Sequence, residues 1–387
     1  MNSFEVFFLL QLLLLVICFY SGYKIKNNNF LNLYVLLFVI SFTLIEGLRF
    51  GRGIDYNIYY QSFQVFDSSN IQGSSAILFD SLRLICKKYE LPYQCVIIIS
   101  SFLLAISGIK LLVQYPQILF LSLPWFYLVT FSAENLFRWY AGFSFILLGI
   151  PYLFKEKAYM YALFCLLGVG FHLMMFVPAL LFYIISKAKT ALLSPLVAIS
   201  IYVFLSLIWS SSAMKNIIAP VNYVLSFWEH YNDVYGGSNL SAWLDGSHHG
   251  LAESSIMRQL IELLKNSFLI VLGHKLLIYF NSKDFTYFYN CMLLGIISYP
   301  VFAPIELMDR FVQLFLFFQC IVGGYIIYCT YEVQQFKQYA IISVIIVVIL
   351  AQGFYKRFTP SNKYYTYYVF NTPIKEYIPV DRLIKGY

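Results

Sequence analysis

The chain has 387 residues, of which 60% are apolar, 20% aromatic and only 12% charged, and its formal net charge is +7. Soluble domains carry about 25% charged residues and roughly half apolar ones, so this composition excludes a soluble or disordered protein. A mean hydropathy of +0.71 instead predicts an all-α, polytopic membrane protein. The seven cysteines show no CxxC spacing, which indicates neither a disulfide framework nor a zinc site.

Apolar runs that meet or approach the length of a membrane span follow one another along the chain. A transmembrane helix needs about 20 apolar residues. The runs are 4–20, 30–48, 93–113, 118–133, 139–154, 190–209, 266–281, 285–305, 311–331 and 338–355. The stretch 158–186 is too long for one span and predicts a hairpin that turns near His172, with a single tilted helix as the alternative. We therefore expect about twelve spans, in a range of about 10 to 14, within one domain over residues 1–387.

Lysine and arginine are distributed unevenly between the predicted loops. Short loops contain Lys24, Lys26, Lys155, Lys157, Lys187 and Lys189, and the positive-inside rule assigns such loops to the cytoplasm. The loops 49–92 and 210–255, and with them the basic C-terminal tail, then face outward. Arg49, Arg138 and Arg310 would lie at outer ends of apolar helices, where an unpaired cation is costly, and this favours anion binding. Pairing with acidic residues is the alternative, preferred for Arg83 and Arg258.

The most informative segment follows the second predicted span. It reads Glu46-Gly-Leu-Arg-Phe-Gly-Arg-Gly-Ile-Asp-Tyr-Asn-Ile-Tyr-Tyr60. Its glycines permit a tight turn with close backbone approach to a ligand. Arg49 and Arg52 are cations, Asp55 is a carboxylate, and Tyr56 and Tyr59 offer aromatic faces. These groups predict a site for a phosphorylated sugar, although interfacial anchoring by Arg and Tyr at a helix end is the alternative.

The longest polar stretch, 210–255, mixes aromatic side chains with acids and amides. Trp228 and His230 lie in it. Aromatic rings stack on pyranose faces while polar groups hold hydroxyls, so the stretch predicts a large extracytoplasmic, glycan-binding loop; an interfacial aromatic belt is the alternative. The sequence contains no Walker, GxSxG, HExxH, Asp-x-Asp or nucleic-acid-binding motif. We expect no metal and no nucleic-acid partner.

Four motifs together resemble the EpsG family, the Wzy-type bacterial polymerases of O-antigen, capsule or exopolysaccharide. The most specific is Arg49-x-Gly51-x-Gly53-x-Asp55-Tyr56-x-x-Tyr59. The later ones place Arg138 in Asn-Leu-Phe-Arg-Trp-Tyr-Ala-Gly-Phe, His172 in Gly-Phe-His-Leu-Met-Met and Arg310 in Met-Asp-Arg-Phe. Trp139 is a departure, because the family often has Gln there. The resemblance spans most of the chain.

The resemblance implies a glycosyltransferase in the bacterial cytoplasmic membrane, with its site facing outward and no cofactor. Such an enzyme moves a growing glycan from undecaprenyl diphosphate to a hydroxyl of a lipid-linked repeat unit. Its partners would be these lipid-linked glycans, membrane lipid, a chain-length regulator and a flippase. Preorganised arginines would stabilise the diphosphate, and the candidates are Arg49, Arg52, Arg138 and Arg310.

The acceptor hydroxyl would need a general base. An unperturbed imidazole has a pKa of about 6.5 and suits this role. His172 is therefore the first candidate and Asp55 the second; a hydrogen-bonded structural histidine is the alternative for His172.

Two other classes of protein fit part of the sequence. A lipid-linked oligosaccharide flippase would also be a polytopic protein with arginines, but it should show pseudo-symmetric halves, and the sequence contains no internal repeat. An O-antigen ligase or a membrane acyltransferase is the nearer enzymatic alternative. Since the ligase shares the donor and the outer site, only the EpsG-like motifs separate it from a polymerase.

Overall fold

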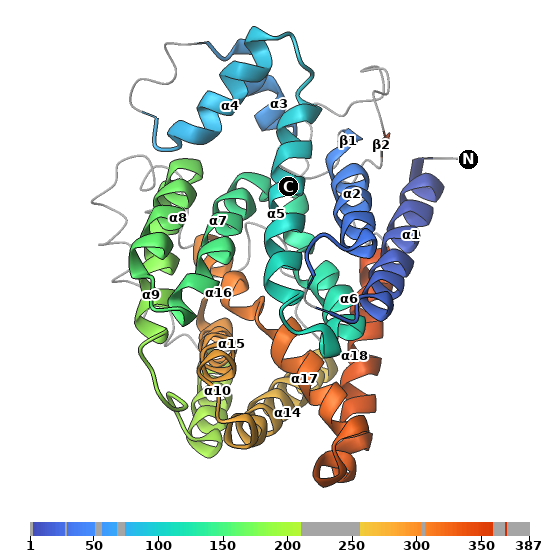
Figure 1. The fold of residues 1–387 in the computed structure, drawn as a ribbon, viewed down its shortest axis with the longest axis vertical. Coiled ribbons are helices and arrows are strands. Elements are labelled where there is room, and N and C mark those ends of the chain that lie inside the picture. The colour runs from blue at the N-terminus through green and yellow to red at the C-terminus, as the bar shows by residue number, and fades with distance from the viewer. Residues whose placement is uncertain are drawn as a thin grey trace. The chain divides into compact units, whose positions relative to one another are not determined.

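The computed structural model describes residues 3–27, 29–50, 56–67, 74–209, 256–302, 306–358 and 368–369 (Figure 1). Contacts divide the chain into two compact units: unit 1 is Met1–Ser186 with Leu350–Tyr387, and unit 2 is Lys187–Ile349. The single domain over 1–387 stays a prediction.

Unit 1 is a group of helices with one short strand pair. Its elements are α1 (Ser3–Lys24), α2 (Leu33–Gly47), β1 (Arg49–Phe50), α3 (Tyr56–Val65), α4 (Ile77–Lys88), α5 (Gln94–Leu112), η2 (Pro116–Ile118), α6 (Leu119–Val129), η3 (Phe131–Glu134), α7 (Phe137–Phe154), α8 (Ala158–Phe171), η4 (Leu173–Met175), α9 (Phe176–Ile185) and β2 (Tyr368–Val369).

Unit 2 is helical throughout its described part. Its elements are α10 (Pro195–Trp209), α14 (Ile256–Phe280), α15 (Lys283–Phe302), α16 (Glu306–Leu316), α17 (Gln319–Glu332) and η5 (Gln334–Tyr339). The last helix, α18 (Ala340–Phe358), begins in unit 2 and ends in unit 1.

The structure is that of a multi-pass membrane protein, but the predicted count of about twelve spans is wrong. Within the described residues, seven helices are long and apolar enough to cross a membrane. Other predicted spans form shorter apolar helices of 10–17 residues: Leu33–Gly47, Pro116–Val129, Ala158–Phe171, Leu173–Ile185 and Pro195–Leu207. The prediction counted apolar residues, but parts of these apolar runs lie outside the helices. Asn32, for example, caps α2 by accepting a hydrogen bond from the backbone N–H of Tyr34.

The stretch 158–186 folds as the predicted hairpin. α8 ends at Phe171, and His172 has an extended backbone from which η4 and α9 return. The Tyr161 hydroxyl donates a 2.7 Å hydrogen bond to the carbonyl oxygen of Ala179, and its ring stacks on Tyr183. Because these contacts join the first third of α8 to α9, the two helices run side by side, and a single tilted helix is excluded.

The α7–α8 crossing depends on two glycines. A methyl group added at Gly168 would lie 2.7 Å from the carbonyl oxygen of Gly142, and one added at Gly142 would lie 2.8 Å from Cγ of Met175. Small residues at such positions let helix backbones approach closely in membrane proteins. The crossing holds the start of α7, which carries Arg138, beside the turn that carries His172.

We therefore expect Gly168→Ala to lower the free energy of unfolding by about 1–3 kcal/mol, because the clash is with backbone that cannot rotate away. The measurement is the apparent unfolding temperature of the detergent-solubilised protein. Leu166→Ala is the matched control, since Leu166 lies on the same helix and is 68% exposed. Equal unfolding temperatures for Gly168→Ala and the parent protein would contradict the close crossing.

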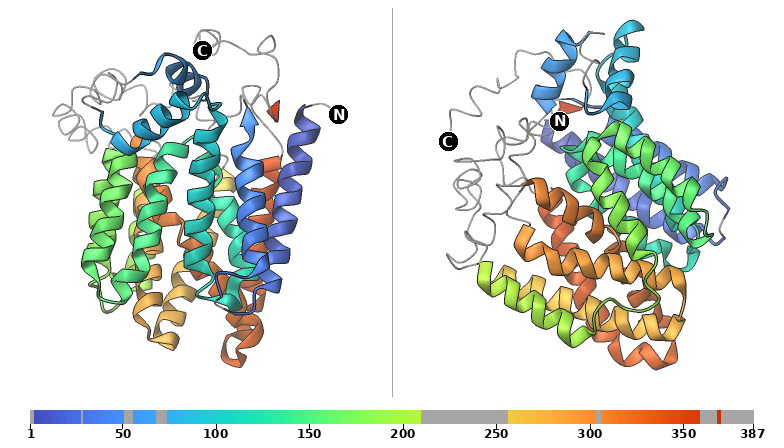
Figure 2. Two further views of the ribbon diagram at one scale, coloured as in Figure 1. Left: turned by 45° about the horizontal axis from the view of Figure 1, so that its top comes forward. Right: turned by 90° about the vertical axis from the view of Figure 1, so that its left-hand side faces the viewer.

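Arginines and lysines are distributed unevenly between the helix ends of unit 1, although α4 carries Lys87 and Lys88 beside Arg83. Gly47 at the end of α2 packs on Ile98 near the start of α5, and Arg49 bonds to Glu134 shortly before α7. We call this end, over which α3 and α4 lie (Figure 2), the arginine end. At the opposite end, α1, α5 and α7 finish beside Lys24, Lys110 and Lys155. This distribution of arginines and lysines agrees with the predicted distribution. Which side of the membrane each end faces stays a prediction.

The C-terminal tail reaches the arginine end. β2 pairs with β1 in antiparallel register, with Arg49 opposite Val369 and Phe50 opposite Tyr368. Residues 368–369 therefore lie at the same end as the Arg49 segment. This agrees with the expectation that the tail shares its side of the membrane with that segment.

Candidate functional site

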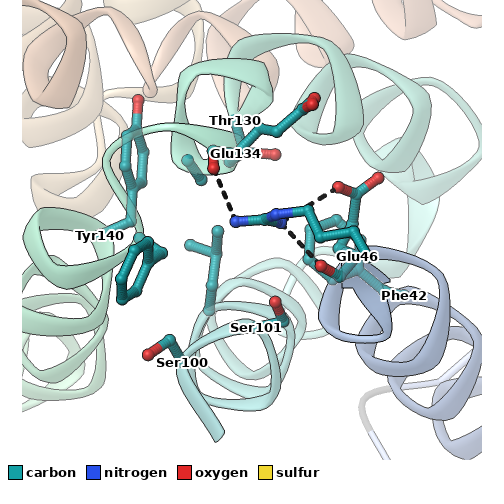
Figure 3. A pocket seen from close by; sticks show the side chains of 11 residues that line it. Phe42, Glu46, Ser100, Ser101, Thr130, Glu134 and Tyr140 are labelled. Carbon is teal, nitrogen blue, oxygen red and sulfur yellow. Dashed lines mark hydrogen bonds and ion pairs between the residues drawn. The ribbon is translucent and has the colours of Figure 1, made fainter. Parts of the chain in front are cut away.

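A pocket at the arginine end lies between α2, α5, α6, η3 and the start of α7 (Figure 3). Its empty space is about 300 Å³, including the mouth. The residues that line it are Phe42, Glu46, Arg49, Ser100, Ser101, Leu104, Thr130, Ala133, Glu134, Phe137 and Tyr140. A buried cation, two carboxylates and several hydroxyls thus meet in one cavity.

Arg49 is the fixed cation of this pocket. It is 3% exposed, and its Nη1 donates to the carbonyl oxygen of Glu46 at 2.7 Å. Its Nη2 donates to the carbonyl oxygen of Glu134 at 2.6 Å. The last carbonyl groups of a helix lack intrahelical partners. A guanidinium directly after α2 is therefore well placed to donate hydrogen bonds to them. Two backbone contacts from separate elements fix the orientation of its planar fork.

Two buried acidic residues in the pocket were missed by the sequence reasoning. Glu46 is 5% and Glu134 6% exposed, and a Glu46 carboxylate oxygen lies 3.7 Å from Nη1 of Arg49. The i, i+3 spacing of Glu46 and Arg49 is a recognised signal for an ion pair on one helix face. The sequence signal for Glu134 is weaker: it is an acidic residue four positions before Arg138.

Arg138, the first-turn arginine of α7, has a different environment. Its guanidinium carbon lies 5.8 Å from the ring centroid of Tyr59 and 5.7 Å from that of Phe79, both within the range of cation–π attraction. Its Nε is buried without a hydrogen-bond partner. No ion pair or hydrogen bond of this side chain occurs among the residues that the structure describes.

Arg83, in the same unit, differs from Arg138 because polar side chains contact its guanidinium group. Its Nη1 lies 3.0 Å from an Asp80 carboxylate oxygen, its Nη2 donates to the Ser62 hydroxyl at 2.7 Å, and its guanidinium lies 3.9 Å above the Phe66 ring. The predicted acid pairing of Arg83 is confirmed. The Arg258 side chain lies outside the described residues.

A cluster of aromatic rings lies beside Arg138. Tyr56 is buried and stacks on Tyr60 at 6.1 Å, while Tyr59 packs edge-on against Phe137 at 5.0 Å. The Tyr93 hydroxyl is buried, and within the described residues it has no hydrogen-bond partner. Burial raises the pKa of Tyr93 well above its ordinary value, and nearby Tyr56 adds to this shift. Tyr93 therefore stays a neutral hydroxyl at physiological pH.

His172 lies at the α8–α9 turn and does not line the pocket. It is 6% exposed, and its ring packs edge-on against Trp139 at 4.8 Å. Its Nδ1 accepts a hydrogen bond from the backbone N–H of Met174 at 3.3 Å. In a neutral imidazole one ring nitrogen accepts and the other carries the proton, so this bond assigns the proton to Nε2. The geometry favours a structural cap, and the general-base role stays a prediction.

Substitution of His172 separates these two roles. We expect His172→Asn to keep most of the stability and activity, because an amide oxygen can accept the Met174 N–H, whereas His172→Ala should lose about 0.5–2 kcal/mol of stability, as for other lost caps. The measurements are the unfolding temperature and the rate of glycan polymerisation. Loss of about 10²–10⁴-fold in rate for both variants, with unchanged unfolding temperatures, would identify His172 as the base instead.

The other predicted site residues lie in unit 2 or outside the described residues. Arg310 lies in α16 of unit 2, where it is partly buried. Arg52, Asp55, Trp228, His230 and the whole loop 210–255 lie outside the described residues. Within the described residues, no group of three or more His, Cys, Asp or Glu side chains is placed to hold a metal ion.

Comparison with known proteins gives one match. The sequence model of the EpsG family matches residues 32–371. This range contains every residue that lines the pocket, together with Arg138, His172 and Arg310, and it begins after α1. No curated protein and no solved structure matches the chain.

Proposed function

Because the chain belongs to the EpsG family, the family of Wzy-type polysaccharide polymerases, we propose that it transfers a growing glycan from undecaprenyl diphosphate to a lipid-linked oligosaccharide repeat unit. The bond between the anomeric carbon and the diphosphate oxygen breaks, and the anomeric carbon joins an acceptor hydroxyl oxygen. The products are the lengthened glycan, the lipid diphosphate and a proton.

The observation that carries this proposal is the environment of Arg138. A diphosphate leaving group gains negative charge as its bond to the sugar breaks, and a preorganised cation in a site of low dielectric stabilises that charge best. Tyr59 and Phe79 hold the Arg138 guanidinium, while its donors meet no protein acceptor within the described residues. Such a planar fork binds two phosphate oxygens at once.

The other groups have complementary roles. Arg49, fixed by two carbonyl oxygens, balances the charge of Glu46, and Tyr59, which is partly exposed, offers a ring face to a sugar. Since Nδ1 of His172 accepts a backbone hydrogen bond, we assign the role of general base to Asp55. Arg52, Arg310, Trp228 and His230 complete the proposed contacts to diphosphate and glycan.

The experiment that tests the function is removal of the chain from its host, followed by analysis of the glycan. Loss of a polymerase leaves single repeat units attached to the final acceptor. Loss of an O-antigen ligase would leave long chains on lipid, and loss of a flippase would leave lipid-linked units facing the cytoplasm. Either of the last two outcomes would overturn the proposal.

We also propose that the protein lies in the bacterial cytoplasmic membrane with its arginine end outside. The test is labelling of one introduced cysteine in a background without the native ones. Tyr89→Cys at the arginine end should react with an impermeant maleimide in intact spheroplasts, whereas Tyr159→Cys should react only after permeabilisation. Tyr89 and Tyr159 are 66% and 70% exposed, respectively. The reverse pattern would invert the orientation.

A further inference from the structure

A glutamine lies in the apolar helix α1, where its side chain is completely buried. Gln11 is 0% exposed and stands between runs of leucine in a helix long and apolar enough to cross a membrane. An amide buried in apolar surroundings is costly unless its donor and acceptor are both satisfied. The contacts of Gln11 therefore indicate why the position is not another leucine.

Gln11 connects two other buried polar side chains. Its Nε2 donates to Oε1 of Glu46 at 2.9 Å, and its Oε1 accepts a hydrogen bond from the Tyr127 hydroxyl. Tyr127, in α6, is also 0% exposed. The other carboxylate oxygen of Glu46 lies 3.7 Å from Nη1 of Arg49. A continuous polar path thus leads from α6 through α1 and α2 to the pocket.

We propose that Gln11 and Tyr127 are positioning residues for the pocket, a role that rests on the proposed function. The last torsion of a glutamate side chain is broad and roughly two-fold, so each hydrogen bond to a carboxylate oxygen narrows its rotation. Because Gln11 holds Oε1, Oε2 stays directed at Arg49, and Tyr127 in turn fixes the amide of Gln11. The two residues orient the Glu46 carboxylate, which adds to the two carbonyl contacts that fix the guanidinium of Arg49.

This role differs in its consequences from simple helix association. Interhelical hydrogen bonds from amides and hydroxyls hold membrane helices together, and removing such a bond lowers stability without changing the chemistry of the folded protein. A positioning residue instead changes the rate, because a displacement of about 1 Å in a site can cost about 10²-fold. Removing a positioning residue also has no further effect on the rate once the group that it positions has been altered.

Gln11→Leu, Glu46→Gln and the double variant form the test, with Asn266→Leu as matched control. Asn266 is a buried amide in the membrane helix α14 whose Nδ2 donates to the Tyr202 hydroxyl at 2.9 Å, so its loss removes the same kind of bond within unit 2. Two quantities are measured on purified protein: the unfolding temperature, and kcat/KM for polymerisation of lipid-linked repeat units per folded molecule.

We expect Gln11→Leu and Glu46→Gln each to lower kcat/KM by about 10-fold to 10²-fold. The double variant should be no slower than Glu46→Gln alone, because residues that act as a unit are non-additive. Asn266→Leu should lower the unfolding temperature and leave kcat/KM within about 2-fold. Tyr127→Phe should reproduce part of the Gln11→Leu loss.

Several outcomes would overturn the proposal. If Gln11→Leu behaves like Asn266→Leu, Gln11 only joins helices, and if the two rate losses multiply, it does not act through Glu46. Failure of the proposed function looks different, because the parent protein itself would then not polymerise. In that case the unfolding temperatures still test the link: additive losses for Gln11→Leu and Glu46→Gln would exclude it.

Discussion

Replacing Arg138 by lysine is expected to slow glycan polymerisation by about 10²–10³-fold, the usual effect of removing one donor that stabilises developing negative charge. An ammonium keeps the positive charge but loses the bidentate fork, and its smaller head cannot cover both Tyr59 and Phe79. The folded protein should remain intact, because in the described structure Arg138 has no ion pair to lose. The measurement is the polymerisation rate with purified lipid-linked repeat units in nanodiscs.

Arg83→Lys is the matched control for this experiment. It makes the same chemical change in the same unit, but its guanidinium is already engaged by Asp80 and Ser62. We expect Arg83→Lys to lower the unfolding temperature and to leave the rate per folded molecule within a few-fold. A parent-like rate for Arg138→Lys, or equal rate losses in the two variants, would remove Arg138 from the diphosphate site.

Replacing Arg49 by methionine is expected to lower the free energy of unfolding by about 3–5 kcal/mol, as when one partner of a buried ion pair is removed. Glu46 would stay buried beside an apolar side chain, and the carbonyl oxygens of Glu46 and Glu134 would both lose a donor. Yield and unfolding temperature measure the effect. Arg49→Lys should fold better because it keeps the charge, yet it should polymerise slowly because one ammonium cannot reproduce the fixed fork.

A second substitution, at Glu46, tests whether the buried Glu46 carboxylate causes the loss of stability in Arg49→Met. Glu46→Gln in the Arg49→Met background removes the carboxylate charge that Arg49 balanced, so it should recover part of the lost stability, and it should recover none of the activity. If Arg49→Met is as stable as the parent protein, the two carbonyl contacts and the ion pair contribute little. The arginine would then be free to serve as a ligand group alone.

The positions of the helices were predicted from the sequence better than their lengths were. Apolar runs locate helices because burial or membrane insertion requires them, and the hairpin at 158–186 followed from a run too long for one span. Their ends depend on caps such as Asn32 and His172, which are single polar residues that an apolar count passes over. The estimate of about twelve spans failed for this reason.

The candidate site was predicted in part, and the missing part has a common cause. Arg49, Tyr56 and Tyr59 are close in sequence, so their grouping was visible as a motif. Glu134 meets Arg49 across 85 residues and Gln11 meets Tyr127 across 116. Contacts at such separations are decided by helix packing, which one sequence does not reveal. A lone amide in an apolar helix, such as Gln11, was the available signal.

Because β1 pairs with β2, the surroundings of Arg49 depend on a segment that is translated much later than Arg49 itself. Val369, the register partner of Arg49, is translated long after Gln11 and Arg49. A nascent chain interrupted before residue 368 can insert its helices into the membrane but lacks the strand beside its buried cation. Shortened translation products would therefore occupy the membrane without the complete surroundings of Arg49, and a fusion placed between α18 and β2 would separate the two strands in the same way.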